Sequence, residues 1–484
     1  MTALFGHRTL RHKALVGGLL VILLIESCTT NGRAPTDRGQ EGPKTLRWRA
    51  CASRFECATL EVPVDHERPN GREISLGLVR QTARDSSRRI GTLLLNPGGP
   101  GGSAVTFVED VAPQLDDAVQ DRFDIVGFDP RGVGRSNAID CAGEREMYLA
   151  DPTIDDDDDR DALLATSRAF VADCARKYEE LLPHLGTRDV ARDMERLRVA
   201  LAEDELTFVG LSYGTVLGQV YADMFPKRVR AMVLDGVVDL AVSGIESARL
   251  QALGFERVLK AFADDCRAKP LCPITQDPIG AVERVIEAAE RGPLPAPARS
   301  ESAEPGLVTL GLFEAMYSPS LWNSFSTAVA AAVDGDASSL ARLGEAYFDR
   351  ASFEVYFAVS CLDSEWPGVE ELLATAETAA RVAPHFGQSL VADYIRCSLW
   401  PSPPRPLASP VADQAPAMLL VSTTNDPATP YAGGVAVADR LPGSVLLTKV
   451  GNGHTAVVSG DPCIDRAVTS YLVDLELPTK GTRC

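Results

Sequence analysis

The stretch Leu206-Thr-Phe-Val-Gly-Leu-Ser-Tyr-Gly214 carries the strongest indication of the fold. An apolar run of strand length ends in Gly210-Leu-Ser-Tyr-Gly214, and a helical pattern then continues to Phe225. The pattern Gly-x-Ser-x-Gly is typical of a sharp strand-to-helix turn, in which the serine hydroxyl projects outward and the glycines avoid clashes with sheet and helix. We therefore predict that Ser212 is a nucleophile. The alternative is a serine in an ordinary glycine turn at a strand end.

Other apolar runs of strand length lie on both sides of this stretch and alternate with helical patterns. The runs are 92–95, 123–128, 231–234, 417–421 and 444–450, and a helix is expected at 187–202. Such alternation predicts a mostly parallel sheet covered by helices. The fold class that we predict is α/β, in the arrangement of the α/β-hydrolase fold, where the serine is followed along the chain by an acid and then by a base.

A serine hydroxyl is a weak nucleophile and needs a base. Among six histidines, His454 is the one that lies in a loop after a late strand, where this fold places its base. Asp426 follows the preceding strand and is the predicted acid that orients the imidazole. Asp461 and Asp465 remain alternatives, although both follow the histidine. Thr429 is expected either to hydrogen-bond this loop or its carboxylate, or to cap a helix.

The reaction at such a serine develops a negatively charged oxygen, which needs hydrogen-bond donors. One expected donor is the backbone N–H of Tyr213, the residue after the nucleophile. The other is expected from the glycine-rich loop Asn96-Pro-Gly-Gly-Pro-Gly-Gly-Ser103, with Gly99 preferred and Gly98 as the second choice. A phosphate-binding loop is the rival interpretation, but neither the Gly-Lys-Ser/Thr sequence nor the glycine spacing of such loops is present.

Composition and charge argue against several classes of function. The 484 residues include 48 Lys and Arg against 67 Asp and Glu, a net charge of -19, so nucleic acid is not an expected partner. The cysteine and histidine spacings of zinc sites are absent, and we expect no metal and no organic cofactor. The acidic run 155–159 predicts a solvated loop, with a calcium site as the alternative.

The first residues have the pattern of an export signal. A basic segment, 8–13, precedes an apolar run, 15–25, which is short for a membrane-spanning helix, although an uncleaved anchor is the alternative. We predict a signal peptide at 1–27. Cys28 resembles the lipidated cysteine of bacterial lipoproteins, and the polar segment 28–48 would serve as a tether. These features predict a protein of the cell envelope, attached to the membrane through a lipid on Cys28, or a secreted one.

The chain has eleven cysteines, and setting Cys28 aside leaves ten, which can pair fully in an oxidising compartment. Neighbours in sequence make plausible pairs, although sequence alone leaves the connectivity open. These pairs are Cys51–Cys57, Cys141–Cys174, Cys266–Cys272, Cys361–Cys397 and Cys463–Cys484.

The sequence pattern changes between 241 and 405. This region is helical, with amphipathic segments at 251–268 and 279–290. We predict that it is a helical cap. It would be inserted between a first part of the core, 49–240, and a last part, 406–484, that carries the acid and the base.

Three motifs carry a specific resemblance. They are Asn96–Ser103, Val126-Gly-Phe-Asp-Pro-Arg-Gly-Val-Gly-Arg-Ser136, and Gly210-Leu-Ser-Tyr-Gly-Thr215. Together they resemble the tripeptidyl aminopeptidase family of actinobacteria, which includes secreted peptidases and mycobacterial lipoproteins called carboxylesterase A, and is related to proline iminopeptidases. The resemblance spans from about Cys51 to the C-terminus. It implies an α/β-hydrolase core with a helical cap, a triad of Ser212, Asp426 and His454, and removal of short peptides from free N-termini.

An enzyme that acts at free N-termini must bind a protonated amine, and a buried ammonium needs a paired charge. Asp363, Glu365 and Glu354 in the predicted cap are the candidates. The same triad would cleave esters, so the alternative function is a carboxylesterase or lipase that acts on short-chain or lipid esters. A catalytically silent envelope binding protein is a third hypothesis. The expected partner is thus a peptide or ester substrate, and the sequence leaves the oligomeric state open.

Overall fold

The computed structural model of the protein describes residues 46–52, 54–298 and 302–484. The predicted signal peptide at 1–27, Cys28 and most of the predicted tether lie outside the described residues. Within the described ranges, no helix combines the length and the apolar character that a membrane crossing requires.

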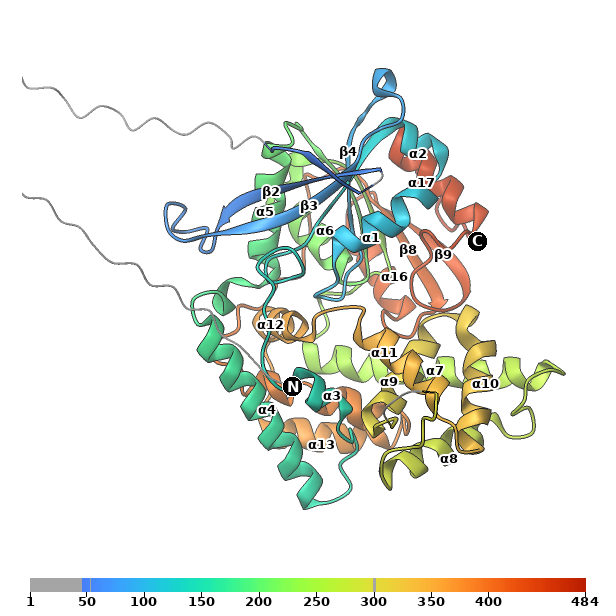
Figure 1. Cartoon of the computed structure of the whole chain (residues 1–484). Coiled ribbons are helices and arrows are strands. Elements are labelled where there is room, and N and C mark those ends of the chain that lie inside the picture. The colour runs from blue at the N-terminus through green and yellow to red at the C-terminus, as the bar shows by residue number, and fades with distance from the viewer. Residues whose placement is uncertain (1–45, 53, 299–301) are drawn as a thin grey trace, which may run out of the picture. The chain divides into compact units, whose positions relative to one another are not determined.

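The described residues form one nine-stranded sheet in the order β1-β2-β3-β5-β4-β6-β7-β8-β9 (Figure 1). The first three strands are antiparallel, and β3 pairs antiparallel with β5. From β5 onward, every neighbouring pair is parallel. The predicted α/β class is therefore confirmed. The strands are β1 (Arg49–Ala52), β2 (Phe55–Pro63), β3 (Glu73–Gln81), β4 (Gly91–Asn96), β5 (Phe123–Phe128), β6 (Leu206–Leu211), β7 (Val229–Asp235), β8 (Leu419–Asn425) and β9 (Val445–Asn452).

Helices cover both faces of the parallel part of the sheet. On β4, Leu94 packs into one core, whereas Leu93 and Leu95 pack into the other, as alternation along a strand requires. Because both faces are covered, the central strands are buried along their whole length and appear in the sequence as continuous apolar runs. One face holds α1 (Ala104–Val111), α2 (Asp117–Arg122) and α17 (Pro462–Asp474), and the other holds α5 (Thr187–Ala200), α6 (Tyr213–Met224) and α16 (Tyr431–Arg440).

Between β7 and β8 the chain forms helices with hydrophobic cores of their own. Two helices from an earlier part of the chain, between β5 and β6, lie among them (Figure 1). Of these two, α3 packs against α9, and α4 packs against α15. We call these helices together the helical layer. Its members are α3 (Glu144–Leu149), α4 (Asp157–Tyr178), α7 (Gly244–Ala268), α8 (Pro278–Glu290), α9 (Pro305–Tyr317), α10 (Trp322–Val333), α11 (Ser338–Phe348), α12 (Phe353–Asp363), α13 (Val369–Ala380), α14 (Gly387–Ala392) and α15 (Ile395–Ser398).

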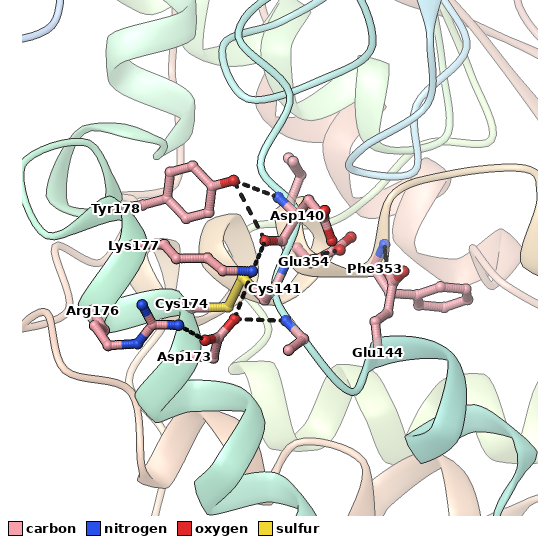
Figure 2. Close-up of a disulfide and its surroundings, with 12 residues drawn as sticks. Asp140, Cys141, Glu144, Asp173, Cys174, Arg176, Lys177, Tyr178, Phe353 and Glu354 are labelled. Carbon is pink, nitrogen blue, oxygen red and sulfur yellow. Dashed lines mark hydrogen bonds and ion pairs between the residues drawn. A yellow bond between two sulfur atoms is a disulfide. The ribbon is translucent and has the colours of Figure 1, made fainter. Parts of the chain in front are cut away.

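The described cysteines form five disulfides, and each pair is the one expected from neighbours in sequence. Figure 2 shows the bond between Cys141 and Cys174, which ties the segment before α3 to α4. Beside it, the backbone N–H of Cys141 donates to Glu354 at 3.3 Å, so the disulfide also lies against the start of α12. Five disulfides indicate that the chain folds in an oxidising compartment.

Candidate active site

Ser212 lies at the turn between β6 and α6, in a conformation that side chains rarely adopt. Its φ is 54° and its ψ is -122°. Such a conformation persists only when the surroundings hold it, and here the backbone N–H of Ser212 donates to the carbonyl of Asp235 on β7 at 2.8 Å. The flanking positions have no room for a side chain, because a Cβ on Gly210 would lie 2.3 Å from the carbonyl oxygen of Gly214. The local sequence thus folds as the predicted strand-to-helix turn.

His454 and Asp426 meet at the carboxyl ends of two neighbouring parallel strands, β8 and β9. His454 Nδ1 lies 2.9 Å and 3.0 Å from the two carboxylate oxygens of Asp426. Asp426 is fully buried, and its Oδ1 also accepts the backbone N–H groups of Ala428 and Thr429 at 2.9 and 2.8 Å. A carboxylate at Nδ1 holds the imidazole in the tautomer that leaves Nε2 free to accept a proton.

The alternative acids have other partners. Asp461 caps α17 and forms an ion pair with Lys449, while Asp465 lies in the first turn of the same helix. Thr429 takes the first of the two roles expected for it: its N–H donates to Asp426 Oδ1, and its hydroxyl lies 3.4 Å from His454 Nδ1. It does not cap the following helix, α16, whose N-cap residue is Pro430. Of the three acids considered from sequence, Asp426 is the one that contacts the histidine.

One cavity of about 950 Å³ brings these groups together. Ser212, His454, Tyr213 and both candidate glycines of the loop between β4 and α1 line it. Of the four described histidines, His454 is the one in this lining. The loop touches the nucleophile turn, because a Cβ on Gly98 would lie 3.0 Å from Ser212 Cβ. The N–H of Gly98 donates to Asn96 Oδ1 at 3.0 Å and is therefore engaged, which favours Gly99 as the second oxyanion donor.

The helical layer and the segments between its helices contribute a group of aromatic side chains to the lining of the cavity. Tyr317, at the end of α9, contacts the base directly: its carbonyl accepts the N–H of His454 at 2.8 Å, and its ring meets the imidazole edge-on at 5.2 Å between centroids. Sequence reasoning missed this residue, because an aromatic at a helix end usually indicates core packing. The aromatic lining comprises Tyr148, Phe255, Phe313, Tyr317, Tyr347, Phe353, Tyr356, Trp366 and Tyr394.

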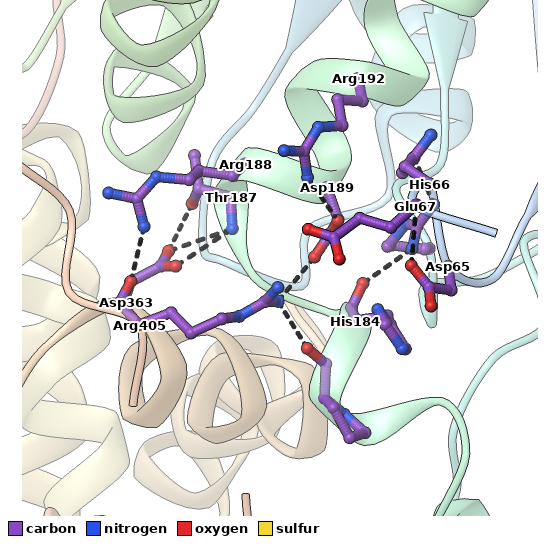
Figure 3. Close-up of polar contacts among 12 residues, drawn as sticks. Asp65, His66, Glu67, His184, Thr187, Arg188, Asp189, Arg192, Asp363 and Arg405 are labelled. Carbon is purple, nitrogen blue, oxygen red and sulfur yellow. Dashed lines mark hydrogen bonds and ion pairs between the residues drawn. The ribbon is translucent and has the colours of Figure 1, made fainter. Parts of the chain in front are cut away.

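The three carboxylates considered for binding a substrate amine occupy different environments. Asp363, the last residue of α12, lines the cavity, and burial raises its pKa to about 7. Its carboxylate accepts hydrogen bonds from Thr187 (Figure 3). Glu354 is buried outside the cavity lining and accepts from Cys141 and Ser352, whereas Glu365 is exposed and also outside the lining.

Asp235, at the end of β7, is a residue of the site that sequence reasoning did not single out. Its buried carboxylate accepts the backbone N–H groups of Ala456 and Val457, each at 2.6 Å, just after His454. Its backbone carbonyl holds Ser212 on the other side. Burial raises the pKa of Asp235 to about 7. One residue therefore braces both the nucleophile turn and the loop of the base.

Several known proteins are similar to this chain over most of its length. The serine protease Hip1 of Mycobacterium tuberculosis is 36% identical and covers 96% of this chain and 96% of its own length. Carboxylesterase B of the same organism is 38% identical, over 88% of this chain and 86% of its own. The tripeptidyl aminopeptidase of Streptomyces lividans is 32% identical, over 91% and 86%. A family model described as TAP-like protein matches residues 383–484.

The chain belongs to the same family as Hip1, carboxylesterase B and the tripeptidyl aminopeptidase. It has the α/β-hydrolase fold and is a serine hydrolase. The resemblance that the three sequence motifs indicated is thereby confirmed. The range matched by the TAP-like model contains β8, β9, Asp426 and His454, and the similarity to full-length relatives extends over the remainder, including Ser212.

Proposed function

We propose that this protein is a serine aminopeptidase that releases short peptides, tripeptides among them, from free N-termini through an acyl-enzyme on Ser212. The observation that carries the proposal is the shared cavity, which is lined by Ser212, by the His454 of a buried acid–base pair, and by the half-buried carboxyl group of Asp363. Two of the similar proteins are named as peptidases, which supports the same class of substrate.

The proposed reaction begins when His454 Nε2 takes the proton of Ser212 Oγ and the oxygen attacks the scissile carbonyl. The N–H groups of Tyr213 and Gly99 then bind the oxyanion of the tetrahedral intermediate. Asp426 stabilises the imidazolium, which passes its proton to the leaving amine. Water then attacks the acyl-enzyme while His454 takes one of its protons. When the released peptide leaves, His454 returns this proton to Ser212 Oγ.

The cavity suits a short peptide with a charged end. A volume of about 950 Å³ lies at the upper end of the range of ligand pockets. An extended tripeptide spans at most about 10 Å, and the aromatic walls offer apolar surface for its side chains. The ammonium group of a bound substrate would pair with the carboxylate of Asp363. This pairing would offset the free-energy cost of keeping the negative charge away from water. Of the three carboxylates considered from sequence, Asp363 is thus our candidate for the substrate amine.

A carboxylesterase or lipase is the second candidate function. The triad and the oxyanion donors serve an ester as well as an amide, and the similarity to carboxylesterase B favours this alternative specifically. The two functions differ in the need for a free amine. An N-acetylated substrate should be poor for the aminopeptidase and acceptable to the esterase.

A matched set of substrates separates these functions: a free tripeptidyl amide, its N-acetyl form, a single-residue amide and a short-chain aryl ester. We expect the wild-type enzyme to cleave the free tripeptidyl amide, with activity lost on acetylation and in Ser212→Ala. Asp363→Asn should raise KM for the free peptide and leave KM for the ester unchanged. Serine-dependent cleavage of the ester alone would replace the peptidase proposal with the esterase.

We also propose that the chain is exported by the signal at 1–27 and held at the membrane by a lipid on Cys28. The five disulfides support export. Cell fractionation of the wild type and of Cys28→Ser tests the attachment. We expect the wild type in the membrane fraction and the variant in the soluble fraction, and an unchanged distribution would contradict lipidation.

A further inference from the structure

Three side chains from three different helices form a chain of hydrogen bonds behind the nucleophile turn. Tyr213, the first residue of α6, places its hydroxyl 2.6 Å from the hydroxyl of Thr187, the first residue of α5. The Thr187 hydroxyl lies 2.5 Å from Oδ2 of Asp363, the last residue of α12 (Figure 3). The helical layer is thereby linked to the residue that follows Ser212.

The direction of this chain follows from the chemistry of its members. A carboxylate only accepts hydrogen bonds, so the Thr187 hydroxyl donates to Asp363 and its oxygen accepts from the Tyr213 phenol. The backbone N–H of Thr187 also donates to both carboxylate oxygens of Asp363, each at 3.2 Å. Thr187 is fully buried and Tyr213 is 9% exposed. In its ionised form, Asp363 accepts stronger hydrogen bonds than a neutral carboxyl group does, and this form orients the whole chain.

The far end of this chain lies at the oxyanion site. Tyr213 follows Ser212, whose backbone conformation is strained, and the backbone N–H of Tyr213 is the proposed oxyanion donor. An oxyanion donor works only if it is held in place before the reaction. Anchoring the Tyr213 side chain at its hydroxyl restricts the rotation of the residue that carries the N–H.

We propose that Thr187 is a positioning residue, whose hydroxyl, oriented by Asp363, holds Tyr213 so that its backbone N–H faces the oxyanion. The inference rests on the proposed catalytic roles of Ser212 and Tyr213. It assigns Asp363 a role beyond contact with the substrate amine. Every substrate that reacts at Ser212 would depend on this role, whether or not it carries a free amine.

Kinetics of Thr187→Val and Thr187→Ser test the proposal. Valine removes the hydroxyl and keeps the shape and the backbone N–H bonds to Asp363, whereas serine keeps the hydroxyl. Because the donor is displaced rather than deleted, we expect Thr187→Val to lower kcat about tenfold, less than the loss of a whole donor. The loss should be equal for the free tripeptidyl amide and the aryl ester, with KM within twofold. Thr187→Ser should restore most of kcat for both.

The two substrates separate this proposal from the proposed peptidase function. A rise in KM for the peptide alone, with an unchanged kcat for the ester, would mean that Thr187 acts only through the amine contact of Asp363, and would overturn the positioning role. An unchanged kcat for both substrates would also overturn it. If the enzyme proves to be an esterase, kcat measured with the aryl ester still tests the role of Thr187.

A second variant covers the case in which Thr187→Val does not fold. Tyr213→Phe leaves the bond between Thr187 and Asp363 in place and removes only the anchor of Tyr213. We expect the same fall in kcat for amide and ester, again with little change in KM. An enzyme with the wild-type kcat for both substrates would overturn the proposal.

Discussion

Alanine at Gly98 would test how closely the glycine-rich loop must approach the nucleophile turn. Gly98 has a φ of +94°, and a Cβ there would lie 2.4 Å from the carbonyl oxygen of Leu211 and 2.9 Å from the backbone nitrogen of Tyr213. Gly335, in the turn between α10 and α11, is a matched control. Its φ is +98°, and nothing lies within 4 Å of the corresponding Cβ position.

Both substitutions place a side chain at a positive φ, but only Gly98→Ala also creates a close contact with a neighbouring segment. A positive φ costs a residue other than glycine roughly 1–2 kcal/mol, so both variants should lose this much stability, and the close contact should destabilise Gly98→Ala further. In Gly98→Ala, the contact of 2.4 Å is about 1 Å shorter than a normal contact of about 3.5 Å. The loop would have to retreat by about that distance, and a misplacement of about 1 Å costs roughly 100-fold in rate.

The assay compares kcat/KM for an aryl ester together with the melting temperature. We expect Gly98→Ala to lose about 100-fold in kcat/KM and to melt at a lower temperature than Gly335→Ala, which should retain wild-type kinetics. If Gly98→Ala had wild-type kcat/KM, the loop would not contribute to the reaction as we infer. An equal loss in Gly335→Ala would show that backbone strain alone is responsible.

Three further predictions follow from named contacts. Asp426→Asn should lower kcat by about 10⁴, because it favours the wrong tautomer of His454; steady-state kinetics with an unchanged circular dichroism spectrum is the check, and a loss under tenfold would contradict the assignment. Burial, reinforced by Glu354, raises the pKa of Glu144 to about 8 from 4.5, so the folded protein holds a proton that the unfolded chain releases, and stability should fall as pH rises between these values. Melting at a series of pH values should show a smaller fall in Glu144→Gln, and identical profiles would argue against the shift. Removing the disulfide between Cys463 and Cys484, with a separation of 21 residues, should cost about 3 kcal/mol in denaturant unfolding, and an unchanged midpoint would show that it does not stabilise the folded state.

The sequence predicted the parts of the site that depend on local pattern and on order along the chain. The turn around Ser212 has a short motif because its glycines are forced by close contact within a few residues. Asp426 and His454 were predictable because each follows a strand of the same sheet in the order that this fold requires. The disulfides agree with the expected pairs because each cysteine bonds with the next cysteine along the chain, at separations from 6 to 36 residues.

Other parts depend on contacts between distant segments, for which the sequence has no local pattern. Asp235 resembles any aspartate at a strand end until the loop after His454 is placed against it. Glu354 and Asp363 lie on the same helix, and only the packing of α12 shows which of them lines the cavity. In the same way, α3 and α4 have ordinary helical patterns, and their place in the helical layer depends on the helices that they meet.

Labelling with a fluorophosphonate, followed by peptide mapping, tests most directly whether Ser212 is the nucleophile of this site. The wild-type protein should carry one adduct, on Ser212, and Ser212→Ala should carry none. His454→Ala should react much more slowly, because the serine would lack its base. A folded wild-type protein that stays unlabelled, or an adduct that forms equally well in Ser212→Ala, would contradict the account.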